Sequence, residues 1–446
     1  MIQLNLVGNH FNLKIMKSPD SKEDVKKVQS IAGRAPRYKY DPVLEADRLD
    51  YWEIPVNQVG EISKLWKPEE LSPTHEVETK LEKFRKLTTP ISWIEDDSIV
   101  FAKKARPYQR QYILADQDKS SLLCAFEQRL GKTFVSLERV SYLGFTNLLI
   151  ITPKIVRTNW QSEINEVLGV EAFIYRGSPQ KRKQLREKLP KIVITNYELV
   201  NELSDKHFDQ VILDEAHLIA NKASKRSKAV LKLKRTNSDS GWQLLTGTPI
   251  LHKPKDLWML IHLIAPEIAG EFDSWVHRYE KTFSITKKKG NRYITIPLST
   301  TYRNLDELSQ RISPVTFRVK RDQIIDVEDR IEIVVTDMTE KQRRLYSEAL
   351  EEARLWVSSQ KSLNIQAALQ RTLRCLQIGE GLFNLDYSLS DSGKLEFLEE
   401  ELSQAEDKIA VWARFKPITN KLYERFKTKA VLLTGDVSDS LRELGK

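Results

Sequence analysis

The sequence predicts an α/β protein whose central sheet is parallel and carries helices on both faces. Short apolar runs alternate with helical patterns through the middle of the chain, and buried strands separated by helices are typical of parallel sheets. Two of these runs end in residue types that bind phosphate and metal. The candidate strands are 122–126, 147–152, 172–175, 191–195, 210–213 and 243–245.

The first of these ends is Gly131-Lys132-Thr133, which follows the run 122–126 and opens a helical pattern. Backbone N–H groups at the start of a helix point at bound anions. Lys132 supplies a point charge toward the outer phosphates, and the Thr133 hydroxyl can bind Mg²⁺. The pattern is incomplete, because Phe126 stands where a full phosphate-binding loop has its first glycine. A plain helix N-terminus with an exposed lysine is the alternative at this point.

The second end is Asp214-Glu215, which follows the buried-strand pattern 208–213. Asp214 can hold the metal, and Glu215 can orient or deprotonate the attacking water. A solvated turn is the alternative for such a pair. Because both blocks follow strands in the order that a nucleotide site needs, we expect ATP and Mg²⁺ as cofactors. The expected catalytic residues are Lys132, Asp214 and Glu215, and the expected metal ligands are Thr133 and Asp214.

Composition indicates several domains and no membrane partner. The 446 residues are too many for one core, no apolar run has membrane-spanning length, and the first residues lack signal-peptide order. We therefore expect a cytoplasmic protein of a bacterium or a phage-infected cell. Lys and Arg exceed Asp and Glu by 71 to 62, a net charge of +9, which a polyanionic partner and a solvated basic surface explain equally well. Cys124 and Cys375 are interpreted as buried thiols.

Four parts follow from the order of patterns along the chain. Residues 1–89 form a small α+β accessory module, a candidate for DNA recognition, which ends in a charged helical linker near 76–86. Residues 99–266 form the first lobe, 267–330 a helical protrusion with a basic hairpin, and 331–446 the start of a second parallel sheet. The second sheet would take its strands from 331–336, 408–412 and 430–434, beside helices at 340–360, 363–377, 394–402 and 417–426.

Between Ala105 and Pro254 the chain resembles the SWI/SNF-type ATPases of helicase superfamily two. The motifs that carry the resemblance are Arg106-Pro107-Tyr108-Gln109, Gly131-Lys132-Thr133, Ile151-Thr152-Pro153-Lys154, Thr195-Asn196-Tyr197-Glu198, Asp214-Glu215-Ala216-His217 and Leu245-Thr246-Gly247-Thr248-Pro249. The resemblance implies a RecA-like ATP-binding lobe over 99–266 and a partial second RecA-like lobe over 331–446.

The resemblance also implies roles for single residues. The implied ATP-binding residues are Arg106, Gln109, Gly131, Lys132 and Thr133, with Gln109 at the adenine edge. His217 is implied in coupling the nucleotide state to Thr246 and Thr248, an interpretation that we prefer to a surface histidine. The implied DNA contacts are Thr152, Pro153, Lys154, Asn196, Tyr197 and Gly247.

Three features depart from the family pattern. Arg129 replaces a glycine two places before Gly131. It is either a solvent-facing loop residue or a guanidinium that supplements phosphate binding or docks on Glu127. His252 stands where the family commonly has asparagine. The sequence reaches Lys446 before the fifth and sixth motifs, whose arginine speeds hydrolysis by about a thousandfold or more. This implies weak hydrolysis by the chain alone, with a missing C-terminal segment or a second polypeptide supplying those motifs.

Two functions stay open at this stage. The first is an ATP-dependent DNA translocase or helicase-like protein that moves on, or remodels, duplex or branched DNA. The alternative is a nucleotide-gated DNA-binding or scaffold protein without turnover. Two basic segments, the run 222–235 and Lys287-Lys288-Lys289 at the hairpin tip, either face solvent or contact DNA phosphates. The first module faintly resembles the HARP-like domains of annealing helicases through Gly33-Arg34 and 52–55.

Overall fold

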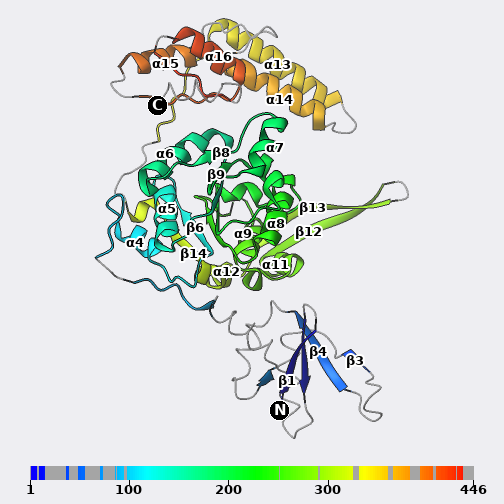
Figure 1. Cartoon of the computed structure of the whole chain (residues 1–446). Helices are drawn as coiled ribbons and strands as arrows, with labels where there is room; N and C mark the ends of the chain where they lie inside the picture. The colour runs from blue at the N-terminus through cyan, green and yellow to red at the C-terminus, as the bar shows by residue number, and fades with distance from the viewer. Residues whose placement is uncertain are drawn as a thin grey trace. The chain divides into compact units, whose positions relative to one another are not determined.

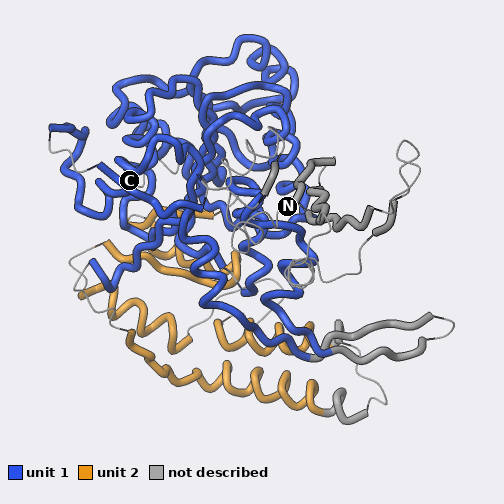
Figure 2. The backbone as a smooth tube through the Cα atoms, turned by 90° about the horizontal axis from the view of Figure 1, so that it is seen from below, with its two compact units in different colours: residues 1–327 blue, residues 328–446 orange. Residues whose placement is uncertain are grey.

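The computed structural model divides into two compact units, residues 1–327 and 328–446 (Figure 2). In the first 85 residues it describes only the backbone of five strands. Beyond them it describes residues 86, 88–94, 98–250, 252–289, 292–324, 331–359, 365–381, 392–404, 408–427 and 429–434.

A five-stranded sheet forms the described part of the N-terminal module. Its strand order is β3-β4-β2-β1-β5, with β1 antiparallel to β2 and parallel to β5. The strands are β1 (Ile2–Val7), β2 (His10–Ile15), β3 (Arg37–Lys39), β4 (Leu49–Pro55) and β5 (Leu71–Pro73). Gly33-Arg34 and nearly all of the linker expected at 76–86 lie outside the described residues.

A seven-stranded parallel sheet with helices on both faces forms the centre of the first unit, which confirms the predicted fold class. In spatial order its strands are β14 (Thr316–Val319), β6 (Leu122–Phe126), β11 (Gly241–Leu245), β10 (Gln210–Asp214), β7 (Leu148–Ile151), β9 (Ile192–Thr195) and β8 (Phe173–Ile174). Six of them match the candidate strands. β14 was missed, because its four residues follow a helical region that the sequence assigned to a protrusion.

Side chains of each strand alternate between two hydrophobic clusters, one on each face of the sheet. In β6, Leu123 and Ala125 belong to one cluster, whereas Leu122, Cys124 and Phe126 belong to the other. Figure 1 shows α4, α5 and α6 on one side of the sheet and α8, α9 and α11 on the other. These helices span α4 (Pro107–Ile113), α5 (Lys132–Tyr142), α6 (Arg157–Leu168), α8 (Lys225–Thr236), α9 (Pro254–Ile264) and α11 (Phe272–Tyr279).

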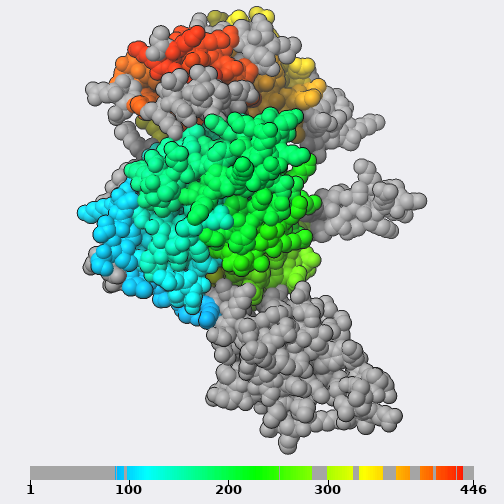
Figure 3. All heavy atoms as spheres, viewed as in Figure 1, coloured from blue at the N-terminus to red at the C-terminus, as the bar shows by residue number. Residues whose placement is uncertain are grey.

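Shorter elements complete the first unit. The coloured residues of this unit form one continuous body in the space-filling view (Figure 3). The predicted hairpin is present and longer than expected, with β12 antiparallel to β13. The remaining elements are α7 (Pro179–Glu187), α10 (Pro266–Ala269), β12 (Glu280–Lys289), β13 (Arg292–Tyr302), α12 (Leu305–Ile312), η3 (Lys154–Val156), η4 (Tyr197–Leu203), η5 (Ala216–Ile219), η6 (Ser313–Val315) and η7 (Arg321–Gln323).

The second unit is helical in its described residues, and its three expected strands are corrected by the structure. The segments 331–336, 408–412 and 430–434 carry no strand pairing there. Ile331 is 84% exposed and Trp412 is 93% exposed. Alternating apolar residues predict a strand only if a partner supplies the ladder hydrogen bonds. The helices lie close to where they were expected: α13 (Glu340–Ser359), α14 (Ile365–Gly379), α15 (Gly393–Gln404) and α16 (Lys416–Arg425).

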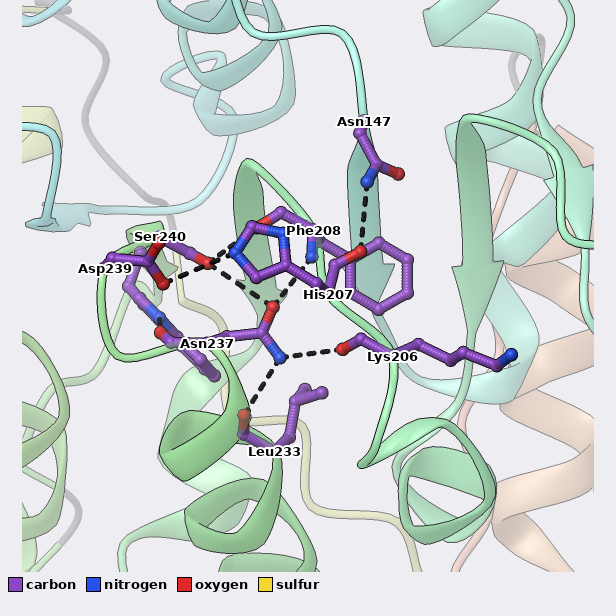
Figure 4. A network of polar contacts seen from close by, with 9 residues as sticks. Asn147, Lys206, His207, Phe208, Leu233, Asn237, Asp239 and Ser240 are labelled. Atoms are coloured by element: carbon purple, nitrogen blue, oxygen red, sulfur yellow. Dashed lines mark hydrogen bonds and ion pairs between the residues drawn. The ribbon is translucent and has the colours of Figure 1, made fainter.

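A polar network closes the amino-terminal edge of the central sheet (Figure 4). The buried amide of Asn237, at the end of α8, accepts a hydrogen bond from the Phe208 backbone N–H and donates to the carbonyls of Lys206 and Leu233. Ser240 donates to the Phe208 carbonyl. A hollow of about 410 Å³ lies beside this network and is lined by Asn147, Arg186, Glu187, Leu189, Pro190, Lys191, Lys206, His207 and Phe208.

Arg139 joins α5 to the end of α4 without an acidic partner among the described residues. Its fully buried guanidinium donates to five carbonyl oxygens, those of Tyr112, Ile113, Ala115, Asp116 and Lys119. Burial lowers the pKa of Arg139. Backbone carbonyls at and just after the end of α4 thus accept from the cation in place of a carboxylate, and these hydrogen bonds fix α4 on α5.

Arg139→Met should lower the free energy of unfolding by about 3 kcal/mol or more, because it leaves several buried carbonyls without a donor. Urea denaturation of the full chain measures the change. Arg235→Met, which removes an exposed guanidinium from the end of α8, is the control and should change stability by about 0.5 kcal/mol or less. Equal stability of the two variants would contradict this account of the α4–α5 contact.

Candidate nucleotide and metal site

The carboxyl ends of four neighbouring strands gather the predicted site residues at one edge of the sheet. Strand β10 pairs in parallel with β7 and β11, and β11 pairs with β6. Chain segments that leave these strands therefore start side by side, as in other open parallel sheets that bind ligands at this edge. The segments begin at Glu127, Thr152, Glu215 and Thr246.

The phosphate loop runs from Glu127 to Gly131, and α5 begins at Lys132. Gly131 has a φ of +80°, a left-handed conformation that suits glycine. The Lys132 Nζ donates to the carbonyls of Phe126 and Glu127, at 3.1 and 3.3 Å. The ammonium is thus folded over its own loop, in a position from which it can turn to a phosphate.

Arg129 adopts a φ of +65° and is exposed. Glycine adopts this left-handed conformation without strain, whereas a side chain adds a steric cost of about 1–2 kcal/mol in this region. Of the alternatives considered for Arg129, docking on Glu127 is not seen in the described part of the chain. The Glu127 carboxylate accepts instead from the Arg321 backbone N–H, at 2.9 Å.

Helix α4 braces the phosphate loop from the side. The Gln109 Nε2 and the Tyr108 hydroxyl both donate to the Leu130 carbonyl, at 3.1 and 3.2 Å. The Gln109 Oε1 accepts from the backbone N–H of Arg106, at 2.8 Å. Gln109 therefore reaches the loop that ends at Gly131, as a residue that contacts both adenine and the loop would. Its role in ATP binding stays a prediction, as does that of Arg106, whose side chain is exposed.

Asp214 is the most constrained side chain of the site. Its Oδ2 accepts hydrogen bonds from the Thr152 hydroxyl at 2.9 Å and from the Trp160 indole at 2.8 Å. Its Oδ1 accepts from the Glu215 backbone N–H at 3.0 Å. The Tyr197 hydroxyl donates to the Asp214 carbonyl at 2.7 Å. Trp160 follows the motif Ile151-Thr152-Pro153-Lys154 in the sequence, but the motif did not indicate that its indole binds Asp214.

The donor set fits Mg²⁺ and no softer metal. Asp214 and the Thr133 hydroxyl offer hard oxygen ligands, and Mg²⁺ is usually bound by one or two carboxylates together with substrate phosphates and water. In the described residues no group of three or more His, Cys, Asp and Glu side chains could form a protein-only metal cage.

The three predicted coupling residues contact one another beside Asp214. His217 Nδ1 lies 3.2 Å from the Glu215 Oε2 and 3.1 Å from the Thr246 Oγ1. The Thr246 hydroxyl oxygen accepts from the Thr248 backbone N–H at 3.1 Å. Glu215 has a φ of +51°, a strained conformation outside glycine that is common at functional sites. The hydrogen-bonded path from Glu215 to the loop after β11 is thus in place.

The predicted DNA contacts divide into buried and accessible residues. The side chains of Thr152 and Tyr197 are buried and bind Asp214, so any contact that these residues make with DNA would use their backbone, and their DNA-binding role stays a prediction. Lys154 is exposed, and Pro153 and Gly247 are half-buried. Only these last three stay accessible to a ligand at this edge.

Asn196 is also buried and belongs to a chain of polar contacts. Its amide accepts from Arg157 at 3.2 Å and donates to Glu198 at 2.7 Å, and Glu198 pairs with Arg226 of α8 at 2.7 Å. Partial burial would raise the pKa of Glu198, but the hydrogen bonds from Asn196 and Arg226 outweigh it and hold the pKa below its usual value. The predicted DNA contact of Asn196 stays a prediction, as do those of Thr152 and Tyr197.

The basic run after β10 is partly engaged within the protein. Arg226 pairs with Glu198, and Lys222 lies over the Phe272 ring with its Nζ 3.5 Å from the ring centre. Lys234 lies 5.0 Å from the centre of the Trp242 ring. The residues left exposed on the α8 surface are Lys225, Lys228, Lys232 and Arg235.

Comparison with known proteins identifies the family. The sequence matches the SNF2-related domain over residues 13–386, well over half of the chain. The chain belongs to the SNF2-related family. This agrees with the order of motifs between Ala105 and Pro254 and with the parallel sheet that carries them.

Curated relatives are similar to this SNF2-related chain over part of its length. It is 31% identical to the ISWI chromatin-remodelling complex ATPase ISW1 of Saccharomyces cerevisiae, over 38% of the chain and 17% of that protein. It is 31% identical to the chromatin-remodelling ATPase INO80 of Cryptococcus neoformans, over 50% of the chain and 14% of that protein. It is 26% identical to the probable ATP-dependent DNA helicase CHR12 of Arabidopsis thaliana, over 68% of the chain and 30% of that protein. The matches thus span less than a third of these relatives.

A solved structure and the sources of the relatives add two findings. The SWI2/SNF2 ATPase core of Sulfolobus solfataricus in complex with dsDNA is similar at 23% identity and a TM-score of 0.42, covering 77% of this chain and 75% of that one. The relatives named above are chromatin-remodelling ATPases of fungi and a plant helicase, so the expectation of a bacterial or phage cytoplasmic protein is wrong. Among the described residues, none of the helices has the length and apolar character to cross a membrane.

Gly131→Ala should disturb both the loop and Gln109. A Cβ at this position would lie 2.6 Å from the Gln109 Nε2, and the φ of +80° is costly for alanine. We expect a loss of about 2 kcal/mol in the free energy of unfolding. In the double variant Gln109→Ala/Gly131→Ala the contact is relieved and the backbone cost remains. A double-mutant cycle by urea denaturation should give a coupling of about 0.5 kcal/mol or more, and strictly additive losses would rule out the Gln109–Gly131 contact.

Proposed function

We propose that this chain is an ATP-dependent DNA translocase or helicase-like ATPase. It would couple ATP binding and hydrolysis to movement on, or remodelling of, duplex or branched DNA. The observation that carries the proposal is the meeting of Lys132, Asp214 and Glu215 at one sheet edge, with a hydrogen-bonded path from Glu215 to Thr246. The names of the relatives, chromatin-remodelling ATPases and a DNA helicase, support it.

ATP would lie with its phosphates over the start of α5. The backbone N–H groups from Gly131 onward and the Lys132 ammonium bind the phosphate oxygens, and Gln109 meets the base beside Leu130. Lys132 must leave the carbonyls of Phe126 and Glu127 to do so. Nucleotide binding would therefore replace two neutral acceptors with a charged one, which forms a stronger hydrogen bond.

Thr133 and Asp214 would hold Mg²⁺, which when bound neutralises charge on the phosphate oxygens. Glu215 would orient the attacking water and accept its proton. Because the Glu215 Oε2 lies 3.2 Å from His217 Nδ1, a change of charge on Glu215 reaches His217 directly. His217 contacts Thr246, which fixes the backbone of Thr248, so the third motif would respond to the state of the nucleotide.

DNA would contact the outer side of the same edge. Lys154 is exposed on the connection between β7 and α6, which also holds Pro153, and Gly247 follows β11, two strands away at the same edge of the sheet. Backbone N–H groups and lysines on such turns bind phosphates without reading base sequence.

The second unit carries exposed apolar side chains that a partner segment would cover. Ile331, Ile333 and Val335 are 84–90% exposed, and Trp412 is 93% exposed. Large apolar side chains in such numbers are costly in water and mark a surface that is covered in use. We propose that a partner segment covers these residues in use.

The second candidate is a nucleotide-gated DNA-binding or scaffold protein without turnover. The same exposed segments of the second unit favour it, because a scaffold protein needs apolar surface to hold its partners. ATPase assays with and without duplex DNA, on this chain and on a version extended by the partner segment, separate the two. If the extended protein shows no DNA-stimulated turnover, and Lys132→Ala behaves identically, the enzyme proposal fails.

Lys132→Ala and Glu215→Gln should separate binding from hydrolysis. Loss of the Lys132 ammonium removes a charge-assisted contact and should weaken binding of a fluorescent ATP about tenfold or more. Glu215→Gln keeps the size of the side chain but cannot accept a proton, so ATP should bind normally while hydrolysis falls about 100-fold or more. Lys183→Ala, an exposed change on α7, is the control. Normal turnover of Glu215→Gln would exclude Glu215 as the base.

Lys154→Glu should weaken duplex DNA binding at low salt and leave ATP affinity unchanged. If Lys154 contacts a phosphate, the slope of log affinity against log salt should fall by about 1. Fluorescence anisotropy across a salt series measures both quantities. Lys183→Glu carries the same charge change on α7 and should have the smaller effect. Equal effects of the two variants would show that only net charge matters, against a contact at the β7–α6 turn.

A further inference from the structure

The two oxygens of the Asp214 carboxylate differ in what they can still bind. Oδ2 accepts from the Thr152 hydroxyl at 2.9 Å and from the Trp160 indole at 2.8 Å. Oδ1 accepts from the Glu215 backbone N–H at 3.0 Å and from no other group among the described residues. A carboxylate oxygen offers two lone-pair directions. Oδ2 is therefore saturated, whereas Oδ1 keeps one direction free.

The donors on Oδ2 are fixed by the fold. Trp160 lies in the first half of α6 with 2% of its surface exposed and packs in the cluster beneath α5 and α6. Its indole N–H can only donate. Thr152 is fully buried, and its backbone N–H continues the β7–β9 ladder by donating to the Thr195 carbonyl at 3.0 Å. Rotation of the Asp214 carboxylate about its Cβ–Cγ bond would break both hydrogen bonds.

We propose that Trp160 and Thr152 are positioning residues that orient the Asp214 carboxylate so that Oδ1 faces the Mg²⁺ of bound nucleotide. This inference rests on the proposed function and deepens it. Outer partners that orient a metal-binding group typically change metal affinity by about 10- to 100-fold when they are removed. Without them, the carboxylate would be free to turn either oxygen to the metal or to neither.

The experiment removes each donor while keeping the shape of the side chain. Trp160→Phe loses the indole N–H, and Thr152→Val loses the hydroxyl. Binding of a fluorescent ADP to the full chain is titrated with Mg²⁺ and repeated in EDTA, and Mn²⁺ binding in the presence of ADP is followed by electron paramagnetic resonance. Each variant should need about 10-fold or more metal for half-maximal effect. Binding of ADP in EDTA should stay within about twofold of the unchanged chain, since no metal is involved.

Two controls isolate the role of the hydrogen bonds. Trp242→Phe removes another buried indole N–H, which donates to the Asn237 carbonyl at 3.1 Å at the opposite edge of the sheet, and should leave the metal titration unchanged. Thr152→Ser keeps a hydroxyl and should restore most of the metal affinity lost in Thr152→Val. If Trp160→Phe does not fold, Thr152→Val and Thr152→Ser still test the same oxygen.

The outcomes are distinguishable from failure of the proposed function. Unchanged metal dependence in Trp160→Phe and Thr152→Val, or an equal loss of ADP binding with metal and in EDTA, would overturn the positioning role alone. If the unchanged chain itself binds nucleotide without any effect of Mg²⁺, the proposed metal site fails, and the inference fails with it. A loss confined to the metal titration in both variants supports the inference.

Discussion

The parallel pairing of β10 with β7 on one side and β11 on the other is the constraint on which the site depends. Its register places Leu213 opposite Ile151 and Asp214 opposite Leu245. The residues that follow these strands therefore begin at one level, although they come from distant parts of the sequence. A shift of one residue in either ladder would turn each side chain of β10 to the other face and move Asp214 out of reach of its partners.

Much of the central sheet could be predicted, because its strands are short apolar runs that contrast sharply with the charged helices between them. The alternation of cluster membership along β6 shows why such strands read as continuous apolar runs: both of their faces are buried. β14 was missed because it has only four residues and lies after the helix α12. The segment 331–336 has the alternating pattern of a strand. A strand also needs a second segment to pair with, and the pattern of the first segment does not identify that partner.

The motifs identified the main chemical groups of the site, but not the direction in which each side chain points. Thr152 and Tyr197 follow strands, and nothing in their spacing distinguishes an outward hydroxyl from one that binds Asp214. Trp160 offered one usable signal, since it lies close after a strand end with polar neighbours on both sides. Buried polar groups need partners, so a tryptophan near a candidate metal carboxylate deserves consideration as a donor.

The hydrogen bonds of the Arg139 guanidinium between α5 and the end of α4 do not depend on an ionised carboxylate. Surface contacts such as Arg182 with Glu202 depend on an ionised carboxylate, and the pKa of Glu202 is lowered chiefly by the hydrogen bond from Arg182. Such contacts lose their stabilising effect as the pH falls through that lowered pKa. Peptide carbonyls do not titrate in this range. On acidification, the peripheral ion pairs should therefore break first. Helix α4, which carries Gln109, should then still be attached to α5, which begins at Lys132.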